Sequence, residues 1–156
     1  MQLTTPQAAN ILIVDDNLNN LKVLVGILSD SPYKIRRAVT GDIALQCITA
    51  APPDLIMLDI ILPDFSGYEI CAKLKQDPET ASIPIIFMSA LSSNADKVKA
   101  FTVGGADYIT KPFESTEVKA RIRNQLQLRA AQAQVKLLTA ELEKMRTVQI
   151  SQSGNN

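Results

Sequence analysis

The sequence contains no histidine, no tryptophan and only two cysteines, Cys47 and Cys71. Without histidine, the usual histidine-containing zinc sites and the Ser–His and Cys–His catalytic pairs are excluded. The two cysteines fall in separate amphipathic helical patterns and not in a C-x-x-C pair, so we expect buried free thiols. Any chemistry must therefore use carboxylates, hydroxyls and lysine.

A net charge and long apolar runs are also absent. Sixteen Lys and Arg residues balance sixteen Asp and Glu residues, so no global field draws the chain onto nucleic acid or an anionic membrane. No apolar run reaches the roughly 18 residues that a membrane span needs, and residues 1–10 lack a basic segment followed by an apolar one. We expect a cytoplasmic protein with no membrane contact and no direct binding to nucleic acid.

The sequence does contain short apolar runs that alternate with amphipathic helical patterns. The chain of 156 residues, 46% of them hydrophobic, suffices for one domain and an appendage of about thirty residues. The apolar runs predict strands at Ile11–Asp15, Lys34–Val39, Leu55–Asp59, Ile83–Ser89 and Tyr108–Thr110. Helical patterns follow at 17–29, 40–50, 68–76, 94–103 and from residue 115 onward. This alternation predicts an α/β fold with a doubly wound, five-stranded parallel sheet and helices on both faces.

The apolar positions also predict which side of each helix is buried. For the helix at 40–50, the predicted apolar side contains Ile43, Cys47 and Ile48. For the helix at 68–76 the predicted face contains Ile70, Cys71 and Leu74. These faces would pack on the sheet.

Polar side chains stand at the ends of the predicted strands. Asp15 and Asp16 end the first strand, Asp59 ends the third, Ser89 ends the fourth, and Lys111 follows the fifth. Function in such folds gathers at the carboxyl ends of the strands, so we expect these groups to converge. Three carboxylates there repel one another by up to about 4 kcal/mol per pair at 4 Å. Mg²⁺, which prefers oxygen ligands, together with Lys111 would offset that repulsion.

This arrangement favours phosphoryl chemistry. Asp59 is a candidate nucleophile, because a carboxylate can attack phosphorus and form an acyl phosphate. A metal ion and Lys111 would stabilise the phosphoryl oxygens. The hydroxyl of Ser89 could then donate to a phosphoryl oxygen and pull its loop inward.

Four short strings carry a family resemblance: Val14-Asp15-Asp16-Asn17, the segment Asp59 to Gly67, Ser89-Ala90 and Lys111-Pro112-Phe113. In this order and at these strand ends, they resemble the receiver domains of response regulators in two-component signal transduction, over about residues 10–125. The resemblance implies the flavodoxin-like strand order 2-1-3-4-5. It also implies a phosphorylation switch and not an enzyme, beyond self-phosphorylation from small donors and autodephosphorylation.

The resemblance assigns a role to each residue of the cluster. Asp59 would accept the phosphoryl group from a histidine kinase or phosphotransfer protein. Asp16, Asp59 and the backbone carbonyl of Ile61 would bind Mg²⁺ or Mn²⁺, and Asp15 would act through water. Lys111 would neutralise charge at the phosphorylation site.

The resemblance also implies a switch. Ser89 and Tyr108 would be coupled, with Tyr108 turning inward when Ser89 engages the phosphate, and the Lys111–Pro112 bond would be cis. The surface around strands four and five and helices four and five would then control partner binding or dimerisation. The expected partner is a downstream protein target or a fused effector.

Two other functions remain open from the residues alone. One is a receiver-like interaction scaffold that works without phosphate. The other is a Mg²⁺-dependent phosphohydrolase, which commonly has a second acid two residues after the nucleophile, where this chain has Ile61.

The last helical pattern is longer than a helix on this sheet needs. It runs from Ser115 to about Gln149 without Gly or Pro, which corresponds to about 52 Å. Apolar residues at alternating spacings of three and four predict a coiled-coil seam of Leu128, Ala131, Val135, Leu138, Leu142 and Met145. Glu141 could pair with Arg146 of a parallel partner, so a homodimer through this helix is predicted. The alternative is an amphipathic tail that folds back on its own domain.

We therefore expect four segments: a flexible N-terminus at 1–9, the receiver domain at 10–125, an extension of the last helix at 126–150 and a disordered tail at 151–156. No output module follows in the sequence. Partners are then recruited in trans, or the helix leads into an effector in a longer chain.

Overall fold

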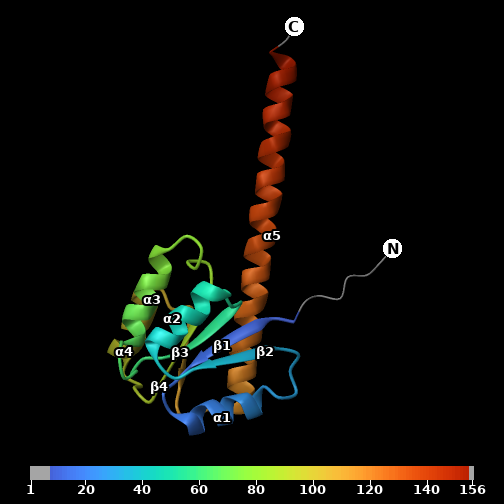
Figure 1. Cartoon of the computed structure of the whole chain (residues 1–156). Coiled ribbons are helices and arrows are strands. Elements are labelled where there is room, and N and C mark those ends of the chain that lie inside the picture. The colour runs from blue at the N-terminus through green and yellow to red at the C-terminus, as the bar shows by residue number, and fades with distance from the viewer. Residues whose placement is uncertain (1–7, 155–156) are drawn as a thin grey trace. The chain divides into compact units, whose positions relative to one another are not determined.

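The computed structural model describes residues 8–154, so most of the predicted flexible N-terminus at 1–9 lies outside the described residues. The five strands form a parallel sheet in the order β2-β1-β3-β4-β5, which confirms the predicted fold class and strand order. Figure 1 labels the first four of these strands. The strands are β1 (Asn10–Val14), β2 (Lys34–Ala38), β3 (Leu55–Asp59), β4 (Ile85–Ser89) and β5 (Asp107–Thr110). The helices are α1 (Leu18–Ile27), α2 (Gly41–Ala50), α3 (Gly67–Gln76), α4 (Asn94–Thr102) and α5 (Ser115–Ser153).

The helices cover both faces of the sheet because successive strand side chains point to opposite sides. On one face, Leu12 and Val14 of β1 belong to an apolar cluster with buried residues of α2, α3 and α4. On the other face, Ile11 and Ile13 pack in a second cluster with α1 and the first turns of α5. The central strand β3 is buried along its whole length. This two-sided burial explains the almost unbroken apolar runs of the sequence.

The buried face of α2 differs from the predicted one. Ile43 is 39% exposed, whereas Ala44 is fully buried and Ile48 nearly so. The first residue of α2, Gly41, packs closely against side chains of other elements, since a Cβ there would lie 2.8 Å from carbon atoms of Ile70 and Phe65. This close approach favours small residues at the interface and rotates Ile43 toward solvent.

Residues 127–156 form a second unit, whose described part is the distal portion of α5. The helix extends to Ser153 and so includes the first three residues of the segment 151–156. No Gly or Pro interrupts the chain from Ser115 to Ser153, and each added residue of a formed helix gains one backbone hydrogen bond. Residues 155–156 lie outside the described part. No helix among residues 8–154 is both long and apolar enough to cross a membrane.

The start of α3 lies directly against the backbone of Asp59. The hydroxyl of Ser66 accepts a hydrogen bond from the N–H of Tyr68 and caps the helix. The N–H of Gly67 donates to the carbonyl of Ile60 at 2.7 Å. A Cβ on Gly67 would lie only 2.3 Å from the carbonyl oxygen of Asp59. Glycine is therefore required here so that the helix can approach the strand end.

Replacing Gly67 with alanine should destabilise the fold by about 1–3 kcal/mol or more, because the new methyl group meets backbone that cannot move away easily. Gly26 is the matched control, since no atom lies within 4 Å of a Cβ built there. Gly26→Ala in α1 should stabilise the protein by up to about 1 kcal/mol. Urea unfolding of both variants measures the difference. Equal stability of the two variants would contradict this packing.

Candidate functional site

The sheet brings the polar strand-end residues to one edge. Val14 of β1 pairs with Leu58 of β3, Asp59 pairs with Met88 of β4, and Ser89 pairs with Thr110 of β5. Because all strands are parallel, Asp15, Asp59, Ser89 and Lys111 all follow or end their strands on the same side. The strand-end residues singled out in the sequence therefore converge.

Three carboxylates gather at this edge. One oxygen from each of Asp15, Asp16 and Asp59 lies within 4.8 Å of the other two. Asp15 has no exposed surface, Asp59 is 5% exposed, and Asp16 faces solvent. A donor set of carboxylate oxygens that is open on one side fits a hard divalent cation that keeps several waters. The acidic cluster is thus compatible with a divalent metal site.

Lys111 bridges the two buried carboxylates. Its Nζ lies 3.0 Å from Oδ2 of Asp15 and 2.9 Å from Oδ2 of Asp59. Burial alone would lower the pKa of Lys111, but hydrogen bonds and attraction from both aspartates outweigh it and raise the pKa. The side chain therefore carries a positive charge, which partly offsets the repulsion between the two acids.

The environment of Asp59 raises the pKa of its carboxyl group above the ordinary value. Burial raises the pKa of this carboxyl group, the charge of Asp15 raises it further, and Lys111 opposes both without cancelling them. The N–H of Ile61 donates to Oδ1 of Asp59 at 3.2 Å, so both carboxylate oxygens have a donor. These two donors hold the carboxyl group of Asp59 in a fixed orientation. Because Lys111 does not fully offset burial and the charge of Asp15, a further cation beside Asp59 would be stabilising.

Asp15 is held by two groups that sequence reasoning did not assign to it. Its Oδ1 accepts from the backbone N–H of Asn17 at 2.9 Å, and its Oδ2 accepts from Nδ2 of Asn20 at 3.2 Å. The side chain of Asn17 also caps the start of α1. Asn20 was not singled out. The signal that could have found it is its place in the first turn of a helix that starts directly after the acidic pair.

The residues of the predicted switch surround the loop after β4. The hydroxyl of Ser89 accepts from the N–H of Leu91 at 3.0 Å. Tyr108 is 5% exposed, and its hydroxyl donates to the carbonyl of Leu91 at 2.5 Å. Burial raises the pKa of Tyr108, so the phenol stays protonated and can donate. Tyr108 thus already points inward in this structure.

The segment after β5 is tied to the same loop. The N–H of Lys111 donates to the carbonyl of Ser89 at 2.8 Å, and the Lys111–Pro112 peptide bond is cis, the isomer that the resemblance implied. This segment directs the lysine side chain back over the end of the sheet, toward Asp15 and Asp59.

Comparisons with known proteins agree with this architecture. Residues 11–123 match the family described as response regulator receiver domain. The chain is 35% identical to the response regulator PleD of Caulobacter vibrioides, over 75% of this chain and 26% of that protein. It is 40% identical to the DNA-binding dual master transcriptional regulator RpaA of Synechocystis, over 72% of this chain and 47% of that protein. The chain thus spans less than half the length of these curated relatives.

A solved structure adds support for the fold. The signal receiver domain of a signal transduction histidine kinase from Syntrophus aciditrophicus superposes with a TM-score of 0.71 and 32% identity. The match covers 77% of this chain and 91% of that one.

The raised pKa of Asp59 predicts a gain in stability for Asp59→Asn in metal-free buffer. A carboxyl with a raised pKa in the folded state stabilises the fold below its ordinary pKa of 3.8, and this contribution is lost as the pH rises through the folded-state pKa. At about pH 7 the asparagine variant should therefore be more stable than the wild-type chain, and below about pH 4 the difference should vanish. Urea unfolding at both pH values, with a chelator present, measures it. A variant that is less stable at neutral pH would show that Lys111 outweighs burial.

Proposed function

Because this chain belongs to the family of response regulator receiver domains of two-component systems, we propose that Asp59 accepts a phosphoryl group from a histidine kinase or phosphotransfer protein. The observation that carries this proposal is the convergence of Asp15, Asp16 and Asp59 with Lys111 at the carboxyl edge of the sheet. Histidine kinases draw the phosphoryl group from ATP, so we propose that the exchange takes place in the cytoplasm.

The transfer is a nucleophilic substitution at phosphorus. A carboxylate oxygen of Asp59 forms a bond to phosphorus while the bond from phosphorus to the donor's imidazole nitrogen breaks, and that nitrogen keeps the electron pair and takes up a proton. Lys111, whose Nζ lies 2.9 Å from Asp59, is within reach of the incoming phosphoryl oxygens and offsets their charge. The chain therefore supplies the acceptor and a fixed cation, and the kinase supplies the phosphoryl group.

We propose Mg²⁺, or Mn²⁺, as the cation at the acidic cluster. Asp16, Asp59 and the backbone carbonyl of Ile61 would hold it, and Asp15 would contact it through water. When bound, the ion neutralises carboxylate and phosphoryl charge. The all-oxygen donor set supports this assignment.

We propose that Ser89 and Tyr108 transmit the phosphorylated state. Ser89 is buried, with 2% of its surface exposed. Its hydroxyl would donate to a phosphoryl oxygen, and this new bond would move the loop that contains Leu91. The side chain of Tyr108 already points inward and donates a hydrogen bond to the carbonyl of Leu91 in that loop. It would then keep the loop in its new position. The surface of α4, β5 and α5 would present the change to a downstream protein target or to a fused effector. No direct contact with nucleic acid or membrane is part of this proposal.

A phosphate-independent scaffold and a phosphohydrolase remain the alternatives. Ile61 stands where the hydrolase would have its second acid, and its side chain is 64% exposed beside Asp59. The scaffold would not need the buried lysine bridge between Asp15 and Asp59. Both observations favour a phosphoryl acceptor.

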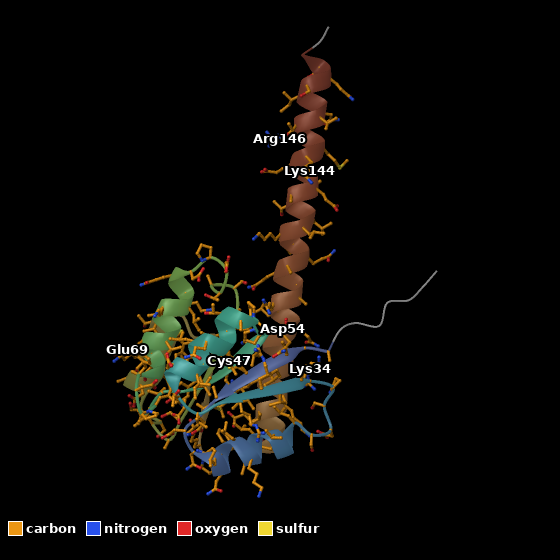
Figure 2. All side chains as sticks on the ribbon, viewed as in Figure 1. Lys34, Cys47, Asp54, Glu69, Lys144 and Arg146 are labelled. Atoms are coloured by element: carbon orange, nitrogen blue, oxygen red, sulfur yellow. The ribbon has the colours of Figure 1, made fainter. Side chains whose placement is uncertain are left out.

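Incubation with acetyl phosphate and Mg²⁺ should add one phosphoryl group to the chain, detectable by intact mass and lost in base. Asp59→Asn should abolish the addition, because the nucleophilic oxygen is removed. Glu69→Gln is the matched control, since Glu69 is an exposed acid on α3 outside the cluster (Figure 2).

The alternatives give different results in this experiment. Steady release of inorganic phosphate without a labelled intermediate would favour the hydrolase, and an unchanged mass in the presence of Mg²⁺ would favour the scaffold. Labelling that survives Asp59→Asn would contradict the assigned acceptor.

We also propose that two copies pair through the distal part of α5 as a coiled coil. The predicted seam is unpartnered within the described chain: Val135 is 62% exposed, Leu142 66% and Met145 67%. In a parallel, in-register pair, Glu141 lies at a g position and Arg146 at the following e position, so each can pair with the other in the second copy. Figure 2 labels Arg146 on this helix.

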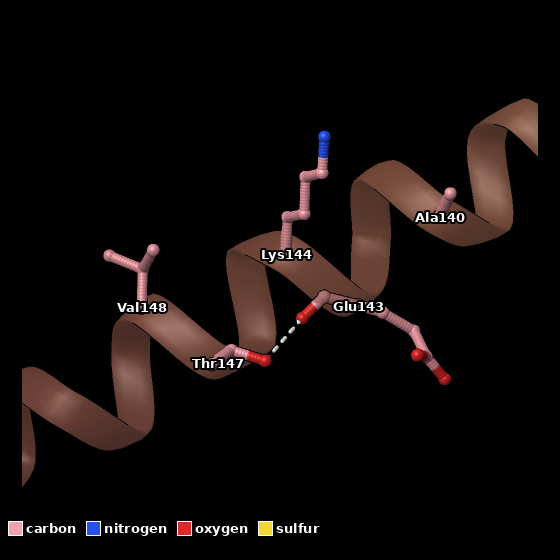
Figure 3. A pocket seen from close by; sticks show the side chains of 5 residues that line it. All are labelled: Ala140, Glu143, Lys144, Thr147 and Val148. Atoms are coloured by element: carbon pink, nitrogen blue, oxygen red, sulfur yellow. Dashed lines mark hydrogen bonds between the residues drawn. The ribbon is translucent and has the colours of Figure 1, made fainter.

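Another face of this segment carries an open surface hollow. The hollow has a volume of about 550 Å³ and is lined by Ala140, Glu143, Lys144, Thr147 and Val148, whose side chains Figure 3 shows. All its lining residues come from one helix face and are exposed. The Thr147 hydroxyl donates to the carbonyl of Glu143 at 2.9 Å and is thus occupied within the helix.

Leu142→Arg should weaken the dimer and shift the chain toward monomer, because it inserts a charge into the apolar seam. Leu137→Arg is the matched control, since Leu137 is exposed to a similar degree, 61%, but lies outside the seam. Sedimentation equilibrium over a range of concentrations measures the change. A wild-type chain that stays monomeric, or equal effects of the two variants, would contradict the seam.

A further inference from the structure

Asp15 is the most completely enclosed member of the acidic cluster. It has no exposed surface, and three donors reach its carboxylate. Oδ1 accepts from the backbone of Asn17 at 2.9 Å, and Oδ2 accepts from Nδ2 of Asn20 at 3.2 Å and lies 3.0 Å from Nζ of Lys111. A buried carboxylate oxygen without a donor is costly, so these donors determine where the group can point.

Two of these donors, Lys111 and Asn20, have different roles at the site. Lys111 is shared, because its Nζ is also 2.9 Å from Asp59, and the proposed reaction brings new negative charge to Asp59. Asn20 contacts only Asp15 among the three acids, and it carries no charge. It can therefore orient Asp15 without neutralising it and without competing for the phosphoryl group.

We propose that Asn20 is a positioning residue for this site: its amide satisfies the buried Oδ2 of Asp15, so that Lys111 can turn toward the phosphoryl group and Asp15 stays oriented toward the cation. Without Asn20, Lys111 is the single side-chain donor to that oxygen. Movement of the lysine would then leave a buried carboxylate oxygen bare. This inference rests on the proposed function and adds a residue to it.

The test compares Asn20→Leu, which keeps the size of the side chain and removes the donor, with Asn19→Leu, an exposed neighbour on the same turn. Mg²⁺ affinity of the unphosphorylated chain is measured by calorimetry, and the rate of labelling by acetyl phosphate is measured at saturating Mg²⁺. Groups that orient metal-binding residues typically change affinity or activity by roughly 10- to 100-fold when removed. Asn20→Leu should lose affinity and labelling rate in this range, while Asn19→Leu should match the wild-type chain.

A second measurement uses the wild-type protein, so it does not depend on the folding of a variant. One side-chain amide proton of Asn20 should exchange with solvent more slowly than those of Asn19, because Nδ2 of Asn20 donates to the buried carboxylate of Asp15. If wild-type labelling and Mg²⁺ binding are normal but Asn20→Leu equals Asn19→Leu, or the two amides exchange alike, the role of Asn20 is wrong. If the wild-type chain binds no Mg²⁺ and gains no phosphoryl group, the proposed function falls as well.

Discussion

The contact of Lys111 with two buried carboxylates is the interaction on which the rest of the site depends. A parallel sheet puts Asp15 and Asp59 at the ends of neighbouring strands, where their charges repel each other. The Nζ of Lys111 lies 3.0 Å from Oδ2 of Asp15 and 2.9 Å from Oδ2 of Asp59, and its positive charge keeps the two carboxylates together. One positive charge does not balance three acids, so the edge retains an attraction for a further cation. The fold therefore leaves an excess of negative charge at the carboxyl edge of the sheet.

The same edge is connected to α4 by two tyrosines. The hydroxyl of Tyr108 donates to the carbonyl of Leu91, just before the helix, and the hydroxyl of Tyr68 donates to the carbonyl of Asp96 within it at 3.2 Å. The ammonium of Lys99 lies 4.7 Å from the centre of the Tyr68 ring. Ala100 is the one residue of α4 that is buried among the described residues. A helix held by so few contacts can respond to changes at Ser89 more easily than a helix with a wide apolar face.

Apolar periodicity allowed the succession of strands and helices along the chain to be predicted, and a parallel sheet predicted that the strand-end residues meet at one edge. The order of the strands within the sheet was implied by the family resemblance. Side-chain contacts between distant segments could not be predicted from the sequence. Ala44 replaces Ile43 in the core because of close packing around Gly41. The carboxylate of Asp64 accepts hydrogen bonds from the backbone of Gly41 and Asp42, across more than twenty residues of chain. Asn20 is a similar case, since only the folded backbone shows that its amide meets Asp15.

A crystal structure of the chain soaked with Mn²⁺ would test the central claim most directly, because anomalous scattering locates this ion without ambiguity. We predict one ion at the carboxyl edge of the sheet, coordinated by Asp16, Asp59 and the carbonyl of Ile61, with Lys111 still beside Asp15. The opposite result would be an edge that binds no ion at saturating Mn²⁺, or side chains of Asp15, Asp16 and Asp59 that point away from one another. Either finding would contradict the account of a cluster kept poised for a cation and a phosphoryl group.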